Sequence, residues 1–264
     1  MLTKEKIDAL HEAIAQYKTA VISLSGGMDS IAMAAASKEV LGADNVKTVT
    51  AITAFLTETE KNTAKQVSER LGIEHSFVRV FLMKSPDVVR NDSKRCYYCK
   101  QIILDGIESV RKNLGFDVIF DGGNISDNCE YRPGAKAVEE HGVVSPFKIA
   151  GFTKEDIAEL MRSYGLAEYI VPSNSCLATR IKTGQQIDFY HIRLVCAAET
   201  YLASKGFTHI RCRVDGDNAK IQVEKSEVPE LLAHADEIIY EIKMIGFKEV
   251  TIDENGYTRS ECLT

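Results

Sequence analysis

Short apolar runs alternate with longer amphipathic stretches along most of the chain. The run from Ala20 to Leu24 precedes a stretch rich in alanine and methionine, Ile31 to Leu41, which has the composition of a helix. The alternation then continues, and it predicts strands over 46–53, 75–81 and 117–121 and helices over 59–71 and 97–113. Short strands separated by helices are typical of parallel β-α-β units. We therefore expect an α/β fold with an open parallel sheet.

The pattern changes around a segment without periodicity. Residues 171–186 contain Pro, Ser, Asn, Thr and Gly, which predicts a long functional loop. Before this loop we expect a short strand over 143–147 and a helix over 154–164 that Thr153 caps. After it, the pattern predicts a small α+β unit with helices over 188–205 and 227–245 and strands over 209–214, 219–223 and 249–252. The chain thus divides into expected domains 1–182 and 183–264.

Composition and charge narrow the class of protein. The 264 residues are 45% hydrophobic and 27% charged, as in ordinary globular proteins. The first residues form a polar amphipathic helix unlike a signal or transit peptide, and no apolar run is long enough to span a membrane. Seven cysteines, an odd number, argue against a disulfide framework, so we expect reduced thiols and a cytoplasmic protein. A net charge of −6 gives no general attraction to nucleic acid.

A glycine loop follows the first predicted strand, with the sequence Ser25-Gly26-Gly27-Met28-Asp29-Ser30. Two glycines allow the backbone to approach an anion, and the next helix directs its positive N-terminal end at the same place. Ser25 and Ser30 can add hydroxyl donors, while Asp29 could help to place a magnesium ion or only start the helix. The loop lacks the spacing and the lysine of a Walker A site. It resembles the PP-loop of ATP pyrophosphatases, although a plain strand-to-helix turn is the alternative.

Further polar residues follow later predicted elements. Asp121-Gly122 comes at the carboxyl end of the strand predicted over 117–121, directly after Val118 to Phe120, so we expect it on the same edge of the sheet as the glycine loop, where it could contact the nucleotide. Asp127 and Arg132 follow on the next loop, where the guanidinium is a candidate phosphate clamp. Lys100, at the start of a predicted helix, could also reach a phosphate. The alternatives are an ordinary turn and solvated side chains.

Two cysteine motifs offer different chemistry. Cys96 and Cys99 form a C-x-x-C at a helix start and could be a redox pair, metal or cluster ligands, or structural thiols. The chain has no second C-x-x-C to complete a zinc ribbon. Cys176 lies alone on the long loop, four residues before Arg180, and a nearby cation favours its thiolate. A buried, inert thiol is the alternative for Cys176.

The motifs S-G-G-x-D-S, C-Y-Y-C-K, D-G-x-N, Y-R-P-G and C-L-A-T-R, in this order along nearly the whole chain, resemble the LarE family. Members are ATP-dependent sacrificial sulfur transferases in the synthesis of a nickel-pincer nucleotide cofactor. The resemblance implies ATP and magnesium as cofactors, a small nucleotide substrate, a homo-oligomer, and Cys176 as the sulfur donor. Other members hold an iron–sulfur cluster on three cysteines. Asn174 and Ser175 beside a single Cys176 favour the sacrificial route, yet Cys96, Cys99 and Cys176 could still form such a set.

The small domain offers a second anion site. His209, Arg211 and Arg213 occupy alternate positions of a predicted strand, which puts them on one face. Together with Arg180, the two arginines are candidates for substrate binding. Glu199 resembles an acidic family position that can bind a metal. An interdomain salt bridge is the alternative use of this face.

Two other classes of function fit the glycine loop. One is another PP-loop enzyme, either a cluster-dependent tRNA thiolase or an adenylate-forming amide ligase. The thiolase would need a basic RNA-binding surface, and the ligase gives Cys176 no purpose. The other is a nucleotide-binding regulator without catalysis, against which the intact loop and Cys176 weigh.

Overall fold

The computed structural model describes residues 2–129, 133–171 and 175–257. Contacts within the chain divide it into two compact units. The first consists of Met1–Leu82 and Cys96–Ser173, and the second of Met83–Arg95 and Asn174–Thr264.

These units differ from the expected domains 1–182 and 183–264 in two segments, 83–95 and 174–182. Both segments belong to the second unit because of their hydrogen bonds. Lys182 N donates to Val214 O at 3.0 Å, and the Asn91 amide donates to Lys182 O at 2.9 Å. At residues 83–95 the chain passes from the first unit into the second and then returns, and hydrophobic periodicity in the sequence does not indicate such a crossing.

A four-stranded parallel sheet forms the centre of the first unit, as expected for the α/β fold. Its order is β3-β2-β1-β4. Its strands are β1 (Ala20–Ser23), β2 (Val46–Ile52), β3 (Glu74–Arg79) and β4 (Val118–Phe120). The chain moves outward from β1 to β3 and then returns to the other side of β1. The carboxyl ends of β1 and β4 lie on either side of this reversal, which is the usual ligand position in such sheets.

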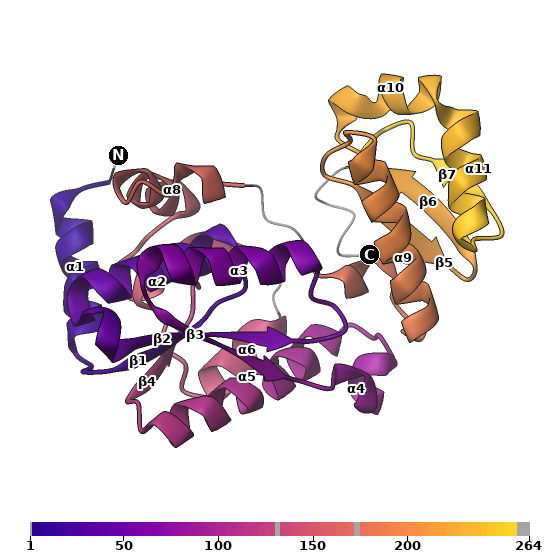
Figure 1. The fold of residues 1–264 in the computed structure, drawn as a ribbon. Coiled ribbons are helices and arrows are strands. Elements are labelled where there is room, and N and C mark those ends of the chain that lie inside the picture. The colour runs from indigo at the N-terminus through magenta and orange to yellow at the C-terminus, as the bar shows by residue number, and fades with distance from the viewer. Residues whose placement is uncertain (1, 130–132, 172–174, 258–264) are drawn as a thin grey trace. The chain divides into compact units, whose positions relative to one another are not determined.

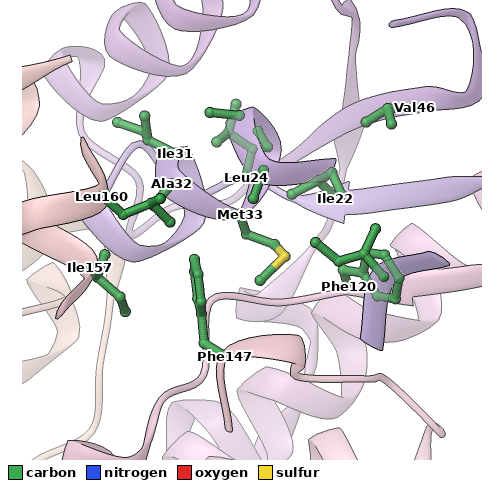
Figure 2. Packing of buried hydrophobic residues seen from close by; sticks show 14 of the residues in the cluster. Ile22, Leu24, Ile31, Ala32, Met33, Val46, Phe120, Phe147, Ile157 and Leu160 are labelled. Atoms are coloured by element: carbon green, nitrogen blue, oxygen red, sulfur yellow. The ribbon is translucent and has the colours of Figure 1, made fainter. Parts of the chain in front are cut away.

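Helices cover both faces of this sheet (Figure 1). They are α1 (Lys4–Ala15), α2 (Met28–Leu41), α3 (Glu58–Leu71), α5 (Arg95–Leu114), α6 (Pro133–Glu140), α7 (Pro146–Ile149) and α8 (Lys154–Ser163). Because side chains alternate along a strand, Ile22 of β1 packs in one apolar cluster and Val21 in the other. Figure 2 shows the larger cluster, in which Leu160 of α8 lies beside Ala32 of α2, and Met33 of α2 points toward Phe120 of the sheet. Each such side chain contributes about 1.5–3 kcal/mol by its burial.

Local signals set several boundaries in the first unit. Thr153 caps α8 through a capping box with Asp156, which confirms the expected start of that helix. Thr57 and Glu60 form the same motif at α3. The strand expected over 143–147 is wrong, because only Val144 bridges to Phe120 before Pro146 begins α7.

The second unit is a three-stranded sheet with helices. Strand β5 pairs antiparallel with β6, and β6 pairs parallel with β7. Helix α9 packs on β5, and α11 packs on both β7 and α9. The helix expected over 227–245 is two helices that meet at His234. The elements are α4 (Pro86–Val89), α9 (Phe189–Ser204), β5 (Arg211–Asp215), β6 (Asn218–Gln222), α10 (Val228–Ala233), α11 (Ala235–Ile245) and β7 (Val250–Ile252).

Within the described residues, every helix is too short or too polar to span a lipid bilayer.

Candidate functional site

The glycine loop joins β1 to α2 in the first unit. Gly26 has φ = 80°, in the left-handed region that favours glycine. A Cβ atom on Gly26 would lie 2.7 Å from the backbone oxygen of Glu60, which is too close for any side chain. The motif therefore needs glycine at position 26 for two reasons: its φ angle and its close contact with α3.

Hydrogen bonds of Ser25 and Ser30 fix the backbone of this loop, residues 25–30, which we call the cradle. Ser25 N donates to Ser30 Oγ at 3.1 Å, and Ser30 Oγ donates to Gly27 O at 2.9 Å. Gly27 is the N-cap of α2 and has no side chain to cap the helix. The first N–H groups of this 14-residue helix thus lack the usual side-chain acceptor, an arrangement that suits a bound anion.

The structure brings the Asp121-Gly122 motif against this loop. A Cβ atom on Gly122 would lie 2.6 Å from the backbone carbon of Asp29. Asn124 Nδ2 lies 3.4 Å from Asp29 Oδ2. The Asp121 carboxylate is oriented by Ser145 Oγ, which donates to it at 2.5 Å, and by Gly123 N at 3.1 Å. Two carboxylate-bearing turns therefore share one edge of the sheet, which is the placement that the sequence predicts for them.

The other nucleotide candidates of the first unit take different positions. Lys100 lies in α5, and a Cβ atom added to Gly134 of α6 would lie 3.6 Å from the Cβ of Lys100. The Asp127 carboxylate accepts the Asn124 N–H at 3.3 Å and lies 3.6 Å from Lys154 Nζ, so it helps to fold its own loop. Arg132 lies outside the described residues. Direct contact of Lys100, Asp127 and Arg132 with ATP stays a prediction.

Cys176 lies on the segment of the second unit that precedes α9, residues 175–188, which we call the Cys176 loop, and its side chain is exposed. The residues that follow it form a short 3-10 turn, Leu177–Arg180. The guanidinium of Arg180 is fully buried beneath this turn. Its Nη1 donates to Ser175 O at 2.8 Å, and its Nε and Nη2 donate to the Glu199 carboxylate at 2.7 and 3.1 Å. Arg180 thus links the backbone of the Cys176 loop to Glu199 of α9 and stabilises the conformation of the loop.

Glu199 acts as the counterion of this arrangement. Besides Arg180, its carboxylate accepts the backbone N–H of Cys212 at 2.9 Å, so one side chain ties α9 to β5 and to the Cys176 loop. No three His, Cys, Asp or Glu side chains are grouped to hold a metal ion in the part of the chain that the structure describes. Metal binding by Asp29 or Glu199 stays a prediction.

Arg211 and Arg213 alternate on β5, but His209 precedes the strand and has φ = 47°. The three-residue alternation expected here is therefore wrong for His209. Arg213 Nη1 donates to Thr179 O at 2.8 Å. Arg211 is buried over the ring of Tyr257, 4.8 Å from its centroid. Burial lowers the pKa of Arg211, and the nearby Arg180 charge lowers it further.

The remaining described thiols differ in exposure. Cys96 is exposed and Cys99 half-buried, both in the first turns of α5 at a spacing that puts them on one helix face. Cys212 is fully buried, and burial raises the pKa of its thiol. Burial also raises the pKa of Cys196. Cys196 and Cys212 are therefore poor nucleophiles.

Comparison with protein families now bears on the first unit. The NAD synthase family model matches residues 3–86, from α1 through β1, the glycine loop and β3 to the start of α4. This part of the chain is a PP-loop domain. PP-loop domains bind ATP, and the loop with Gly26 and Gly27, which lies within the matched residues, is the candidate position for the nucleotide.

Similarity to other proteins extends beyond the PP-loop domain. The chain is 29% identical over 245 residues, 93% of this chain and 89% of the relative, to the pyridinium-3,5-bisthiocarboxylic acid mononucleotide synthase of Lactiplantibacillus plantarum. It is 29% identical to an uncharacterized Synechocystis protein, over 97% of this chain and 96% of the relative. An uncharacterized protein of Methanocaldococcus jannaschii is 26% identical over 91% of each chain. The resemblance predicted from the motifs is confirmed.

Several residues of the site gave weak signals or none in the sequence. Asn124 belongs to the D-G-x-N motif but was not expected to approach Asp29. Ser145, which orients Asp121, follows an unremarkable valine pair and precedes a proline. Asn91 and Arg95, which hold the Cys176 loop, come from a distant segment. Contacts between residues this far apart leave no local pattern.

Proposed function

We propose that this chain is an ATP-dependent sulfur transferase that acts on pyridinium-3,5-biscarboxylic acid mononucleotide and converts a carboxylate to a thiocarboxylate. The observation that carries the proposal is the exposed Cys176 thiol on an organised loop, in a chain that also contains a PP-loop domain. Similarity over 93% of the chain to a synthase of the bisthiocarboxylic mononucleotide supports the choice of substrate.

Adenylylation is the first step. A carboxylate oxygen of the substrate attacks the α-phosphorus of ATP, and pyrophosphate leaves. The N–H groups at the start of α2, which have no side-chain cap, stabilise the departing charge. Asp29 and Asp121 would supply the oxygen ligands that magnesium prefers, and the bound ion would add charge neutralisation.

Sulfur transfer follows on the activated carbonyl. The Cys176 thiolate attacks the acyl carbon and AMP leaves, which gives a thioester. Removal of the Cα proton of residue 176 then forms the Cα=Cβ double bond as the Cβ–S bond breaks. The sulfur departs with the substrate as a thiocarboxylate, and dehydroalanine remains at position 176.

The arginines of the second unit support binding of an anionic substrate. Arg180 has Glu199 as its carboxylate partner, while Arg211 Nε is buried without a hydrogen-bond partner among the described residues. A buried guanidinium with an unused N–H favours an anion at its side. We assign the substrate phosphate or a carboxylate to Arg211 and Arg213, and give Arg180 the role of holding the loop.

A cluster-dependent route is the second candidate. Cys96 and Cys99 share one face of α5 and are at least partly exposed, which suits two ligands of an iron–sulfur cluster, with Cys176 as a third. In that case Cys176 would survive the reaction, whereas the sacrificial route consumes it.

Mass spectrometry of the Cys176 peptide tests the proposal. The purified chain is mixed with ATP, magnesium and the biscarboxylic mononucleotide for one turnover. We expect pyrophosphate release and loss of the elements of hydrogen sulfide from residue 176. A Cys176→Ala variant should still release pyrophosphate but form no thiocarboxylate. An intact Cys176 beside confirmed product would overturn the sacrificial route and favour the cluster. The proposal includes a homo-oligomer in the cytoplasm, where ATP and reduced thiols are available; light scattering tests the assembly.

A further inference from the structure

The segment 83–95 lies far ahead of Cys176 in the sequence, yet it belongs to the same compact unit as the Cys176 loop. Two backbone hydrogen bonds fasten the two segments together. Gly184 N donates to Asn91 O at 2.9 Å, and Ile187 N donates to Val89 O at 2.9 Å. The Cys176 loop is therefore hydrogen-bonded to segment 83–95, which belongs to the second unit although the chain before and after it belongs to the first unit.

Asn91 is the centre of this contact. Its side chain is fully buried, and its φ of 57° lies in the left-handed region, which is uncommon for a residue other than glycine. Its amide nitrogen donates to Lys182 O and Gln185 O, both at 2.9 Å. Its carbonyl oxygen accepts a hydrogen bond from Arg95 Nη1 at 2.5 Å. A buried amide with both of its ends satisfied fixes the loop in one register.

Arg95 extends the contact toward the thiol. Its Nη1 donates to Ala178 O at 3.1 Å, two residues after Cys176. Arg180 and Arg213 bind the carbonyls of Ser175 and Thr179. Arginine side chains thus donate hydrogen bonds to backbone carbonyl groups on both sides of Cys176. Within the described residues of this loop, no strand or long helix is present to provide these carbonyl groups with backbone donors. The thiol itself remains exposed.

We infer that Asn91 and Arg95 are positioning residues that set the geometry of Cys176 for sulfur transfer. This inference rests on the proposed function. Attack on an acyl carbon requires the sulfur at about 3–3.5 Å in the correct direction, and a displacement of about 1 Å can cost roughly 100-fold in rate. The later elimination also depends on the backbone at residue 176, because the Cα–H and Cβ–S bonds must be aligned. Both steps therefore need a loop with one fixed conformation.

Three variants separate positioning from folding. Asn91→Gly removes the amide but keeps a residue that tolerates a left-handed φ. Arg95→Met removes the guanidinium but keeps an apolar stem, and Arg95→Lys restores a single donor. Arg90→Met is the matched control, because Arg90 belongs to the same segment yet is exposed and pairs with Asp87 and Asp92 at the surface.

Two readouts are compared in a single turnover with ATP and the biscarboxylic mononucleotide. Pyrophosphate release reports adenylylation, and dehydroalanine at position 176 reports sulfur transfer. We expect Asn91→Gly and Arg95→Met to release pyrophosphate at the wild-type rate within about twofold, but to form dehydroalanine roughly 10- to 100-fold more slowly. Arg95→Lys should recover part of the loss, and Arg90→Met should match the wild type.

Other outcomes contradict the inference in different ways. Wild-type dehydroalanine formation in folded Asn91→Gly and Arg95→Met would refute positioning and leave the proposed function intact. An equal fall of both readouts, together with a lower urea midpoint, would show a purely structural role. If Asn91→Gly does not fold, the two Arg95 variants decide the question. An intact Cys176 in the wild type after product formation would instead refute the proposed function.

Discussion

The glycine loop and the Cys176 loop both expose a chemical group from irregular backbone, but they are built in different ways. The glycine loop relies on the absence of side chains, because Gly26 and Gly122 allow backbone segments to touch. The Cys176 loop relies on large polar side chains, because Arg95, Arg180 and Arg213 bind its carbonyl groups. The glycine loop should therefore be disrupted by substitutions that add side-chain atoms, and the Cys176 loop by substitutions that remove them.

Gly26→Ala should give the largest effect. The new Cβ would meet the Glu60 carbonyl at 2.7 Å and would also be strained at φ = 80°, so the cradle must deform. We expect pyrophosphate release to fall roughly 1,000-fold, about 4 kcal/mol of lost transition-state stabilisation. Gly42→Ala is the control, because Gly42 has φ = 84° but open space around it. Equal losses in the two variants would show that strain, and not the contact with α3, matters.

Glu199→Ala tests the second loop. The change leaves the buried Arg180 guanidinium without its counterion, which we expect to lower the free energy of unfolding by about 3 kcal/mol. Urea denaturation measures it. Adding Arg180→Met should restore part of the stability, because the unpaired charge is then gone. Glu237→Ala, which breaks only an exposed pair with Lys205, should leave the urea midpoint unchanged. An unaltered midpoint for Glu199→Ala would contradict the role of Glu199 as counterion.

Ser145→Ala sharpens the description of the first loop. Without the Ser145 hydroxyl, the Asp121 carboxylate loses one of its two donors but keeps Gly123 N. We expect pyrophosphate release to fall about tenfold, about 1.4 kcal/mol, with normal stability. Ser163→Ala is a fitting control, since the Ser163 hydroxyl donates to Leu160 O within its own helix α8. An activity equal to that of the control would mean that Asp121 does not need this orientation.

The smallest effect concerns pH and the edge of the sheet. Burial lowers the pKa of His75, and the charge of Lys47 lowers it further. The unfolded state therefore binds a proton more readily than the folded state, and stability should fall as pH decreases below about 6.5. The contribution should stay below about 1 kcal/mol, because His75 is only half-buried and water screens its charge. Urea titrations from about pH 7.5 to 5.5 should show a steeper decline for the wild type than for His75→Gln. Equal slopes would contradict this assignment.

This contrast also explains how far the sequence alone could lead. The parallel sheet, most of its helices and the position of the glycine loop follow from local periodicity and a six-residue motif. Gly26 is recognisable because its requirement lies in its own backbone. The support of Cys176 is not recognisable in this way, because Asn91 and Arg95 reach it only through the tertiary fold. The same limitation applies to Arg180, which sequence analysis assigned to the substrate and which the structure buries beneath its own loop.

Analysis of residue 176 by mass spectrometry after one turnover tests the central claim most directly. The chain is incubated with ATP, magnesium and the biscarboxylic mononucleotide, and the peptide containing residue 176 is compared with that of an ATP-free control. The account predicts dehydroalanine at position 176 in proportion to the thiocarboxylate formed. Thiocarboxylate accumulating while Cys176 keeps its sulfur would contradict it.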